Sequence, residues 1–156
     1  MPAFTIDSTR LNRTLEELGR FGDTSKGMQR IAFSPADIAG REYTISLMHG
    51  AGLETGIDTA GNIIGRRAGS SPGLPAIALG SHTDTVPSGG KYDGALGVMA
   101  AIEAAQTLAD NRVTLRHPVE TLVFTNEEGT RYHRWLIGSR AMAGLLEPED
   151  LTAVDD

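Results

Sequence analysis

The chain has 156 residues and a net charge of −6, with 40% hydrophobic and 22% charged residues. This length and composition predict one globular domain, with no room for a second of ordinary size. The acidic balance argues against a nucleic-acid partner, because phosphate binding needs clustered Lys and Arg. The chain has no cysteine, which excludes disulfides and thiolate ligands, so any metal must be held by His, Asp or Glu.

Nothing in the sequence has the pattern of a secretory leader or a membrane anchor. The first twenty residues are rich in charge, and the longest apolar run, residues 95–105, contains Glu103 and is too short to span a bilayer. We therefore expect a cytoplasmic protein with no membrane partner.

Two helices are predicted in the first third of the chain. Leucines at helical spacing predict the first over residues 9–20, with Ser8 or Thr9 as its N-cap. The second begins in residues 34–37, where serine caps, proline takes the first helical position and aspartate lies at the positive end of the helix dipole. It is expected to run to about His49, since glycines follow.

A loop, a hairpin and a connector follow from the glycines and prolines. Residues 22–27 are expected to form a loop. Residues 53–59 and 62–66 flank an Ala-Gly pair, which predicts a hairpin with Gly61 at positive φ. Residues 69–75 are rich in turn formers and lead into the next strand.

The second half contains a strand–helix–strand pattern. Residues 76–79 and 121–124 are short apolar runs that predict buried strands, and residues 95–108 predict a helix that is apolar nearly all round. This pattern is a βαβ unit with a parallel strand pair, so the fold class is α/β, with a mixed sheet and flanking helices. Function in such sheets lies at the carboxyl ends of the strands, where His82 and the two acids at 127–128 follow.

His82 and Asp84 lie two residues apart in an extended segment, so their side chains point to the same side. His82 could present one ring nitrogen to a metal while Asp84 accepts from the other nitrogen and fixes the tautomer. The alternative is a hydrogen-bonded histidine beside a turn aspartate, because so short a dyad is a weak pattern.

Asp93 lies between glycines, directly before the apolar helix. It could cap this helix, since aspartate is a preferred N-cap. It could instead bridge two cations with its two oxygens, because neighbouring glycines let the backbone approach a cleft closely. The residues themselves leave both roles open.

Glu127 and Glu128 follow the second strand of the pair. Because neighbouring side chains point apart, we expect one carboxylate to bind metal and the other to take a proton from water, and a solvated acidic pair is the alternative. Three clusters at one sheet edge, all with oxygen or nitrogen ligands that suit zinc or manganese, favour the metal site.

Residues 80–87 (GSHTDTVP), 89–98 (GGKYDGALGV) and 124–132 (FTNEEGTRY) form three ordered motifs. Together they resemble the M20-type metallopeptidase and amidohydrolase superfamily. The second and third motifs, with residues 138–140 (GSR), are most similar to its branch of N-carbamoyl-L-amino acid hydrolases, allantoate amidohydrolases and β-ureidopropionases. The resemblance extends over essentially the whole chain.

The resemblance implies two divalent ions, zinc or manganese, and a role for each residue of the site. His82 would bind the first ion, Asp93 would bridge both, and Glu128 would bind the second. Glu127 would be the general base that activates the bridging water, and Asp84 would orient His82. The implied reaction is hydrolysis of a C–N bond in a small-molecule substrate, an N-carbamoyl amino acid or allantoate, and a peptidase or deacylase of the same superfamily is the alternative.

The resemblance also implies a site larger than these 156 residues supply. Family members carry two further histidine ligands, substrate-carboxylate groups and a lid and dimerisation domain downstream, so residues 1–156 would be the N-terminal portion of a zinc-peptidase-like catalytic domain. Each ion would then have two protein ligands, whereas catalytic zinc usually has three. A chain that is inactive alone, with reduced or no metal occupancy, is therefore the alternative function.

Two further expectations concern partners and the other histidines. Family members are homodimers, and uncovered sheet and helix surfaces would favour association. His49 is expected at a helix end and His117 in a solvated loop, while His133 follows the acidic loop and is the only one of the three near enough to touch metal or substrate.

Overall fold

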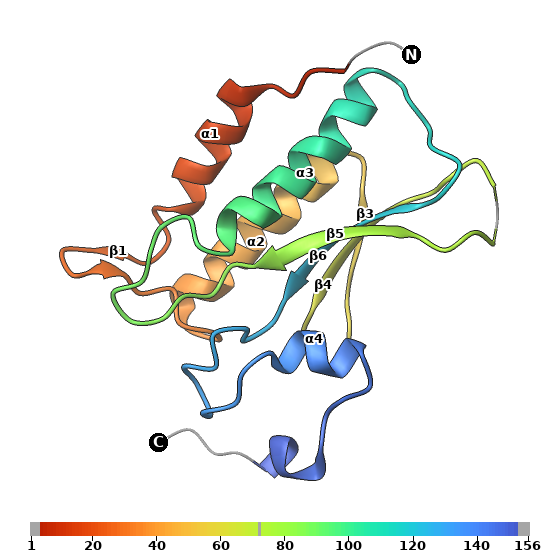
Figure 1. Cartoon of the computed structure of the whole chain (residues 1–156). Helices are drawn as coiled ribbons and strands as arrows, with labels where there is room; N and C mark the ends of the chain where they lie inside the picture. The colour runs from red at the N-terminus through yellow and green to blue at the C-terminus, as the bar shows by residue number, and fades with distance from the viewer. Residues whose placement is uncertain (1–3, 72, 153–156) are drawn as a thin grey trace.

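A four-stranded mixed sheet organises the chain, whose computed structural model describes residues 4–71 and 73–152 (Figure 1). The strands are β3 (Glu54–Ile57), β4 (Ile63–Arg67), β6 (Val119–Phe124) and β5 (Ile77–His82), in that spatial order. β3 pairs antiparallel with β4, and β4 with β6, whereas β5 pairs parallel with β6. The sheet is therefore mixed, and β5 lies at one of its edges.

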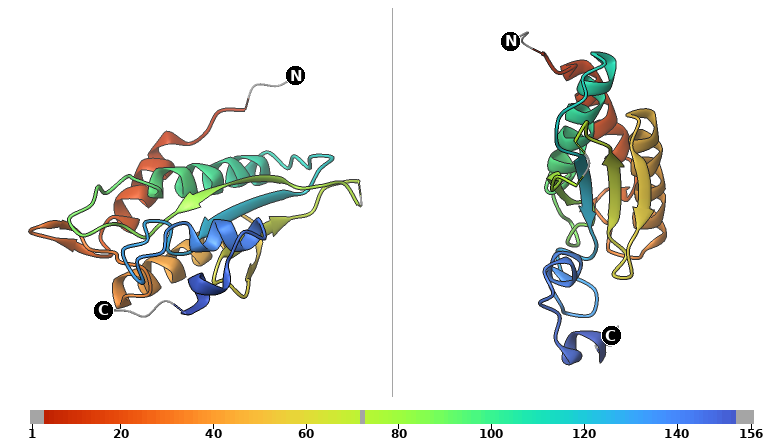
Figure 2. Two further views of the ribbon diagram at one scale, coloured as in Figure 1. Left: turned by 60° about the horizontal axis from the view of Figure 1, so that its bottom comes forward. Right: turned by 90° about the vertical axis from the view of Figure 1, so that its right-hand side faces the viewer.

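Three long helices pack on the sheet: α1 (Ser8–Leu18), α2 (Pro35–Gly50) and α3 (Ala95–Asp110). α3 packs on β5 and β6, α2 on β3 and β4, and α1 against α3. In Figures 1 and 2 these helices lie together against the strands, whereas α4 (Ile137–Met142) and the 3-10 helix η1 (Pro148–Thr152) lie apart from them. None of the helices within residues 4–71 and 73–152 has the length and apolarity needed to cross a membrane.

The core lies between the helices and the sheet. Its fully buried members include Leu18 from α1, Met48 from α2, Val98 from α3, and the paired Ile63 and Val123 from the sheet. Burying each such side chain contributes about 1.5–3 kcal/mol, so this contact layer fixes the parallel β5–α3–β6 unit on which the site depends.

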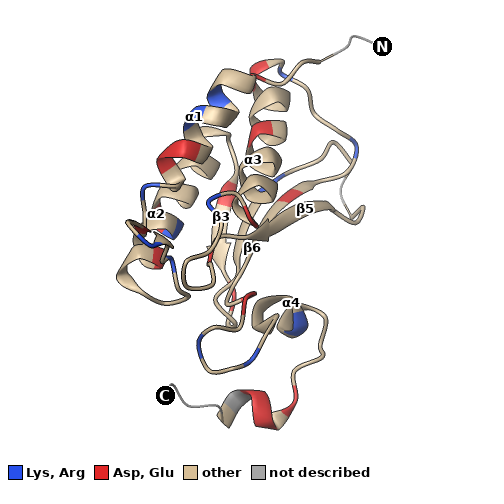
Figure 3. Ribbon diagram, turned by 60° about the vertical axis from the view of Figure 1, so that its left-hand side comes forward, with Lys and Arg blue, Asp and Glu red and all other residues tan. Residues whose placement is uncertain are grey.

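Arg10 of α1 forms two ion pairs with α3, a helix that is uncharged over most of its length (Figure 3). Arg10 Nε lies 2.7 Å from Glu103 Oε2, and Arg10 Nη1 lies 2.9 Å from Asp110 Oδ2. Although burial opposes it, hydrogen bonds from Arg10, the Asp7 N–H and Thr107 hold the pKa of Glu103 below its usual value. Glu103 can therefore stay ionised on this largely apolar helix.

The structure confirms the main predicted elements. α1 and α2 lie where predicted, Ser34 Oγ caps α2 by accepting from the Asp37 N–H, and β3 and β4 form the expected hairpin with Gly61 at φ +87°. The βαβ unit is also confirmed, because β5 and β6 are parallel and joined by α3.

Three local predictions were wrong. The cap of α1 is Asp7, whose side chain accepts from the Arg10 N–H, and neither Ser8 nor Thr9. Residues 22–27 are not simply a loop, because β1 (Asp23–Thr24) pairs with β2 (Gly27–Met28). The strand predicted over 76–79 is not buried: it extends to His82 and is largely exposed, since β5 has a neighbour on one side only.

Asp37 forms a reciprocal cap at the start of α2. Its N–H donates to Ser34 Oγ at 3.2 Å, and its Oδ2 accepts from the Phe33 N–H at 2.9 Å. Burial raises the pKa of Asp37 from 3.8 to about 6, although the Phe33 N–H and the guanidinium of Arg41 act in the opposite direction. The fold is therefore less stable when the Asp37 carboxyl group is ionised than when it is protonated.

We expect Asp37→Asn to change the pH dependence of stability. The folded chain keeps the Asp37 proton between its unfolded pKa of 3.8 and its folded pKa of about 6. The stability that protonated Asp37 contributes to the fold is therefore fully present below about pH 4 and is lost as the pH rises to about 6. Relative to wild type, the variant should gain stability between about pH 4 and pH 7, by up to about 3 kcal/mol. Urea unfolding at pH 4 and pH 7 measures the free energy of unfolding of both proteins. If the difference between variant and wild type is the same at the two pH values, the prediction is wrong.

Candidate metal centre

The ends of β5 and β6 bring two of the sequence motifs together. In the parallel register His82 is the partner of Phe124, so both strands end at the same level. The segment after β5 carries Asp84, and the segment after β6 carries Glu127 and Glu128. Parallel strands with aligned carboxyl ends therefore place the imidazole and the acidic pair side by side.

His82 is buried and held in one orientation. Its Nδ1 lies 3.0 Å from the main-chain oxygen of Asp84, and because a carbonyl only accepts, Nδ1 carries the proton and donates. Nε2 is then left with a lone pair that faces Glu127 Oε2 at 3.4 Å. Two acceptors that face each other call for a proton or a cation between them.

The ring of His82 also depends on a glycine. A Cβ at Gly94 would lie 2.5 Å from ring atoms Cε1 and Nε2 of His82, and Gly94 has φ +62°, where L side chains are strained. The motif that contains Asp93 therefore contributes a backbone surface against which the imidazole fits.

Asp84 acts mainly on the acidic loop. Its buried carboxylate accepts from the Glu127 N–H at 3.3 Å and from the Glu128 N–H at 3.2 Å. Its Oδ1 lies 3.8 Å from His82 Nδ1, so the close contact with the ring is made by the Asp84 main-chain oxygen instead. The sequence associated Asp84 with His82, and the structure adds that its carboxylate joins the two motifs.

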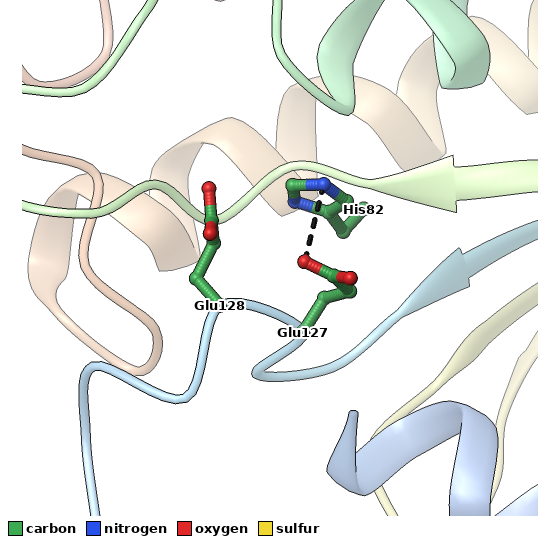
Figure 4. A group of neighbouring side chains, drawn as sticks. All are labelled: His82, Glu127 and Glu128. Atoms are coloured by element: carbon green, nitrogen blue, oxygen red, sulfur yellow. Dashed lines mark ion pairs between the residues drawn. The ribbon is translucent and has the colours of Figure 1, made fainter. Parts of the chain in front are cut away.

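Glu127 and Glu128 converge toward His82 (Figure 4). One ligand atom from each of the three residues lies within 4.8 Å of the other two. The premise that the neighbouring acids point apart is therefore corrected; they follow Asn126, which has φ +48° and begins a turn rather than continuing the strand. Burial raises the pKa of Glu128, and the carboxylates of Asp93, Glu127 and Asp84 add to this while His82 opposes it.

Asp93 lies at the rim of this group. Its side chain is 72% exposed, and its Oδ1 lies 3.9 Å from His82 Nε2. The alternative role as a helix cap is excluded, because the N-cap of α3 is Gly94 and no side chain caps this helix. Asp93 is near enough to the imidazole to complete a larger site without belonging to the group formed by His82, Glu127 and Glu128.

Arg30 supports the site and was not singled out from the sequence. Its buried guanidinium donates from Nε to the Thr83 oxygen at 2.6 Å and from Nη1 to the Leu18 and Phe21 oxygens, each at 2.9 Å. Its main chain also exchanges hydrogen bonds with Thr85. Arg30 thus fixes the segment that contains His82 and Asp84, and no local pattern around it signals this long-range contact.

The other histidines lie elsewhere in the fold. His49 is at the end of α2 as expected, and its Nε2 lies 2.7 Å from Thr55 Oγ1. His117 is half-buried, with Nδ1 2.8 Å from the Pro75 oxygen, and is therefore less solvated than expected. His133 is exposed and is not part of the His82, Glu127 and Glu128 group found within the described residues.

These donors fit a divalent cation. One imidazole nitrogen and two carboxylate oxygens form a hard ligand set that zinc and manganese accept, and three protein ligands leave a coordination position open for water or substrate. The proton on Nδ1 of His82 leaves Nε2 free to bind the metal, as in most histidine ligands.

Comparisons with known proteins agree with this chemistry. The model of peptidase family M28 matches residues 62–154. The chain is 44% identical to the N-carbamoyl-L-amino-acid amidohydrolase of Pseudomonas sp. (strain NS671), over 100% of the chain and 38% of that protein. It is 39% identical to the allantoate deiminase of Arabidopsis thaliana, over 90% of the chain and 27% of that protein.

A solved structure shows the same fold. The hydantoinase/carbamoylase family amidase from Burkholderia ambifaria superposes with a TM-score of 0.93 at 36% identity, covering 97% of this chain and 38% of that one. The chain thus spans between about a quarter and two fifths of the length of these relatives. The family match and the fold confirm the resemblance seen in the motifs: the chain belongs to the M28/M20-like zinc peptidases and is a homologue of metal-dependent amidohydrolases of the hydantoinase/carbamoylase family.

Proposed function

We propose that the chain supplies the metal-binding and proton-transferring half of an amidohydrolase that cleaves a C–N bond of N-carbamoyl amino acids or allantoate. The observation that carries this proposal is the convergence of His82, Glu127 and Glu128 within 4.8 Å of one another at the ends of β5 and β6. The names of the Pseudomonas and Arabidopsis relatives support the substrate class.

In this proposal His82 Nε2 would bind the first ion, the Glu128 carboxylate would bind the second, and Asp93 at the rim would be shared between them. Two divalent ions would polarise a substrate carbonyl and lower the pKa of a water molecule. The chain itself positions the ligands before an ion binds. Asp84 fixes the loop of Glu127 and Glu128 through two hydrogen bonds, and Gly94 packs against the imidazole of His82.

Glu127 is the proposed proton carrier. Its Oε2 lies 3.4 Å from His82 Nε2, and 29% of its side chain is exposed, so it borders the site while remaining accessible to water and substrate. A carboxylate in this place can take a proton from the attacking water and pass it to the departing nitrogen. The Glu127 N–H is fixed by Asp84 Oδ1, which limits movement of the base during transfer.

A second candidate is a chain that binds metal but does not catalyse alone. Within the described residues the site offers three converging ligands and one exposed acid to two ions. A single catalytic zinc usually has three protein ligands, so these groups are too few for two ions. The family model is that of a peptidase, so peptidase or deacylase activity on linear amides is the remaining alternative for the same site.

We expect zinc binding to require His82. In calorimetric titration of the 156-residue chain with Zn²⁺, His82→Ala should weaken binding by on the order of 100-fold or more, because an imidazole ligand is lost. His117→Ala is the matched control. His117 is hydrogen-bonded to the Pro75 oxygen, before the start of the β5–β6 pair, whereas the site lies at the end of these strands. The His117→Ala variant should therefore bind zinc like wild type. Equal affinity of both variants would contradict the site, and tight binding of two ions by wild type would contradict the second candidate.

We expect Glu127→Gln to abolish most of the hydrolytic activity. Ammonia and amino acid release is measured with Mn²⁺ or Zn²⁺ on N-carbamoyl-L-amino acids, allantoate, N-acyl amino acids and dipeptides. The assay uses the chain itself and a chimera that joins it to the remainder of the Pseudomonas relative. The chimera should lose about 10²–10⁴-fold in rate on Glu127→Gln, while Glu42→Gln on the exposed side of α2 should retain it.

Each arm of this assay has a distinct meaning. Full activity of the Glu127→Gln chimera would show that the proposed proton transfer is wrong. An active chimera with an inactive 156-residue chain would support the second candidate, and hydrolysis of N-acyl or peptide substrates alone would support the peptidase or deacylase.

A further inference from the structure

An apolar wall borders the acidic pair. A pocket of about 390 Å³ is lined by Val86, Glu127, Glu128, Trp135 and Leu136. Two of these residues are the candidate ligand and base, and the other three are large apolar side chains. All three residues are exposed, and Trp135 is the most exposed at 71%. This volume lies in the range of small-ligand sites.

The loop between the acidic pair and α4 is built to present this wall. The Leu136 N–H donates to the Glu127 oxygen at 3.0 Å, and the buried amide of Asn126 donates to the Arg131 and Arg134 oxygens, each at 3.1 Å. These bonds close the loop on itself. Trp135 and Leu136 are therefore held outward by the backbone of the site.

Trp135 lies directly on the acidic loop. A Cβ at Gly129 would overlap Trp135 Cδ1, and Gly129 has φ +64°, so this position accommodates only a glycine under the indole. Gly129 follows Glu128, so the indole packs against the backbone next to a candidate metal ligand. Val86 comes from the other motif, two residues after Asp84, and the wall therefore draws on both strand ends.

Such a wall favours one kind of substrate. Burying apolar area is worth about 25 cal/mol per Å², and tryptophan is the residue that most often dominates a binding contact. A ligand whose polar part lies at the carboxylates and whose side chain lies on Trp135, Val86 and Leu136 would gain this energy. A polar substituent would instead lose hydration against two aliphatic side chains and an indole ring, which offer it only the indole N–H as a hydrogen-bonding partner.

Resting on the proposed amidohydrolase function, we propose that Val86, Trp135 and Leu136 form a specificity pocket for the apolar side chain of the substrate. The chain then prefers N-carbamoyl amino acids with branched or aromatic side chains over N-carbamoylglycine and over allantoate, whose substituents are small or polar. A difference of this kind in an apolar pocket is worth about 10- to 200-fold in discrimination.

The chain contains its own probe, because Trp135 is its one tryptophan. Its fluorescence is followed in the zinc-loaded 156-residue chain during titration with N-carbamoyl-L-leucine, N-carbamoyl-L-phenylalanine and N-carbamoylglycine, with zinc alone as the baseline. The leucine and phenylalanine compounds should shift the emission to the blue and protect it from acrylamide, with midpoints about 10-fold or more below that of the glycine compound.

Three variants separate the contribution of the pocket to binding from general effects of surface substitution. Val86→Ser should raise the midpoint for the leucine compound several-fold and narrow its advantage over the glycine compound. Ile57→Ser removes an exposed apolar side chain from β3, outside the pocket, and should leave the ratio of midpoints as in wild type. In the chimera the ratio of kcat/KM for the leucine and glycine compounds should fall about 10-fold on Trp135→Ala.

Several outcomes would overturn the inference. Equal midpoints for the leucine and glycine compounds would do so, as would no emission change with any ligand. If the Trp135 emission shifts to the blue with rising protein concentration in the absence of ligand, the wall is instead a contact between two copies of the chain. A chimera that hydrolyses both compounds equally well would reject the specificity pocket while supporting the amidohydrolase function, and a chimera that hydrolyses neither would reject both.

Discussion

The site depends on one buried carboxylate that joins two loops. Asp84 accepts from the N–H groups of Glu127 and Glu128, so the acidic pair cannot change its position relative to His82 without breaking two charge-assisted hydrogen bonds. A buried charge is retained only when it is satisfied, and these two donors satisfy it. On the other side, Arg30 holds the Thr83 oxygen, so the segment that carries Asp84 is itself fixed to the end of α1.

This constraint produces a group of like charges around one imidazole. Because His82 donates from Nδ1 to a carbonyl, its Nε2 faces the oxygen of Glu127 as an acceptor. Burial and neighbouring carboxylates raise the pKa of Glu128, which is the electrostatic pattern that a bound cation relieves. The apolar wall that includes Trp135 begins where this group ends, so one loop combines the candidate chemistry with a surface for selection.

The features that follow from periodicity and strand order could be predicted from the sequence. The parallel pairing of β5 and β6 follows from two apolar runs separated by an apolar helix, and it brings His82 and Glu127 together. The contacts that depend on distant backbone could not be predicted: the Arg30 guanidinium, the Asp84 carboxylate, and the turn at Asn126 that makes the two acids converge. The exposure of β5 was missed because an apolar run does not show whether a strand has one neighbour or two.

We expect His82 and the carboxylates around it to bind a divalent cation, and zinc K-edge X-ray absorption of the zinc-loaded chain measures this binding directly. The zinc should have a shell of oxygen and nitrogen ligands at about 2.0–2.2 Å, with the scattering signature of one imidazole that disappears in His82→Ala. A zinc shell without imidazole, or an imidazole signature that persists in His82→Ala, would contradict this expectation.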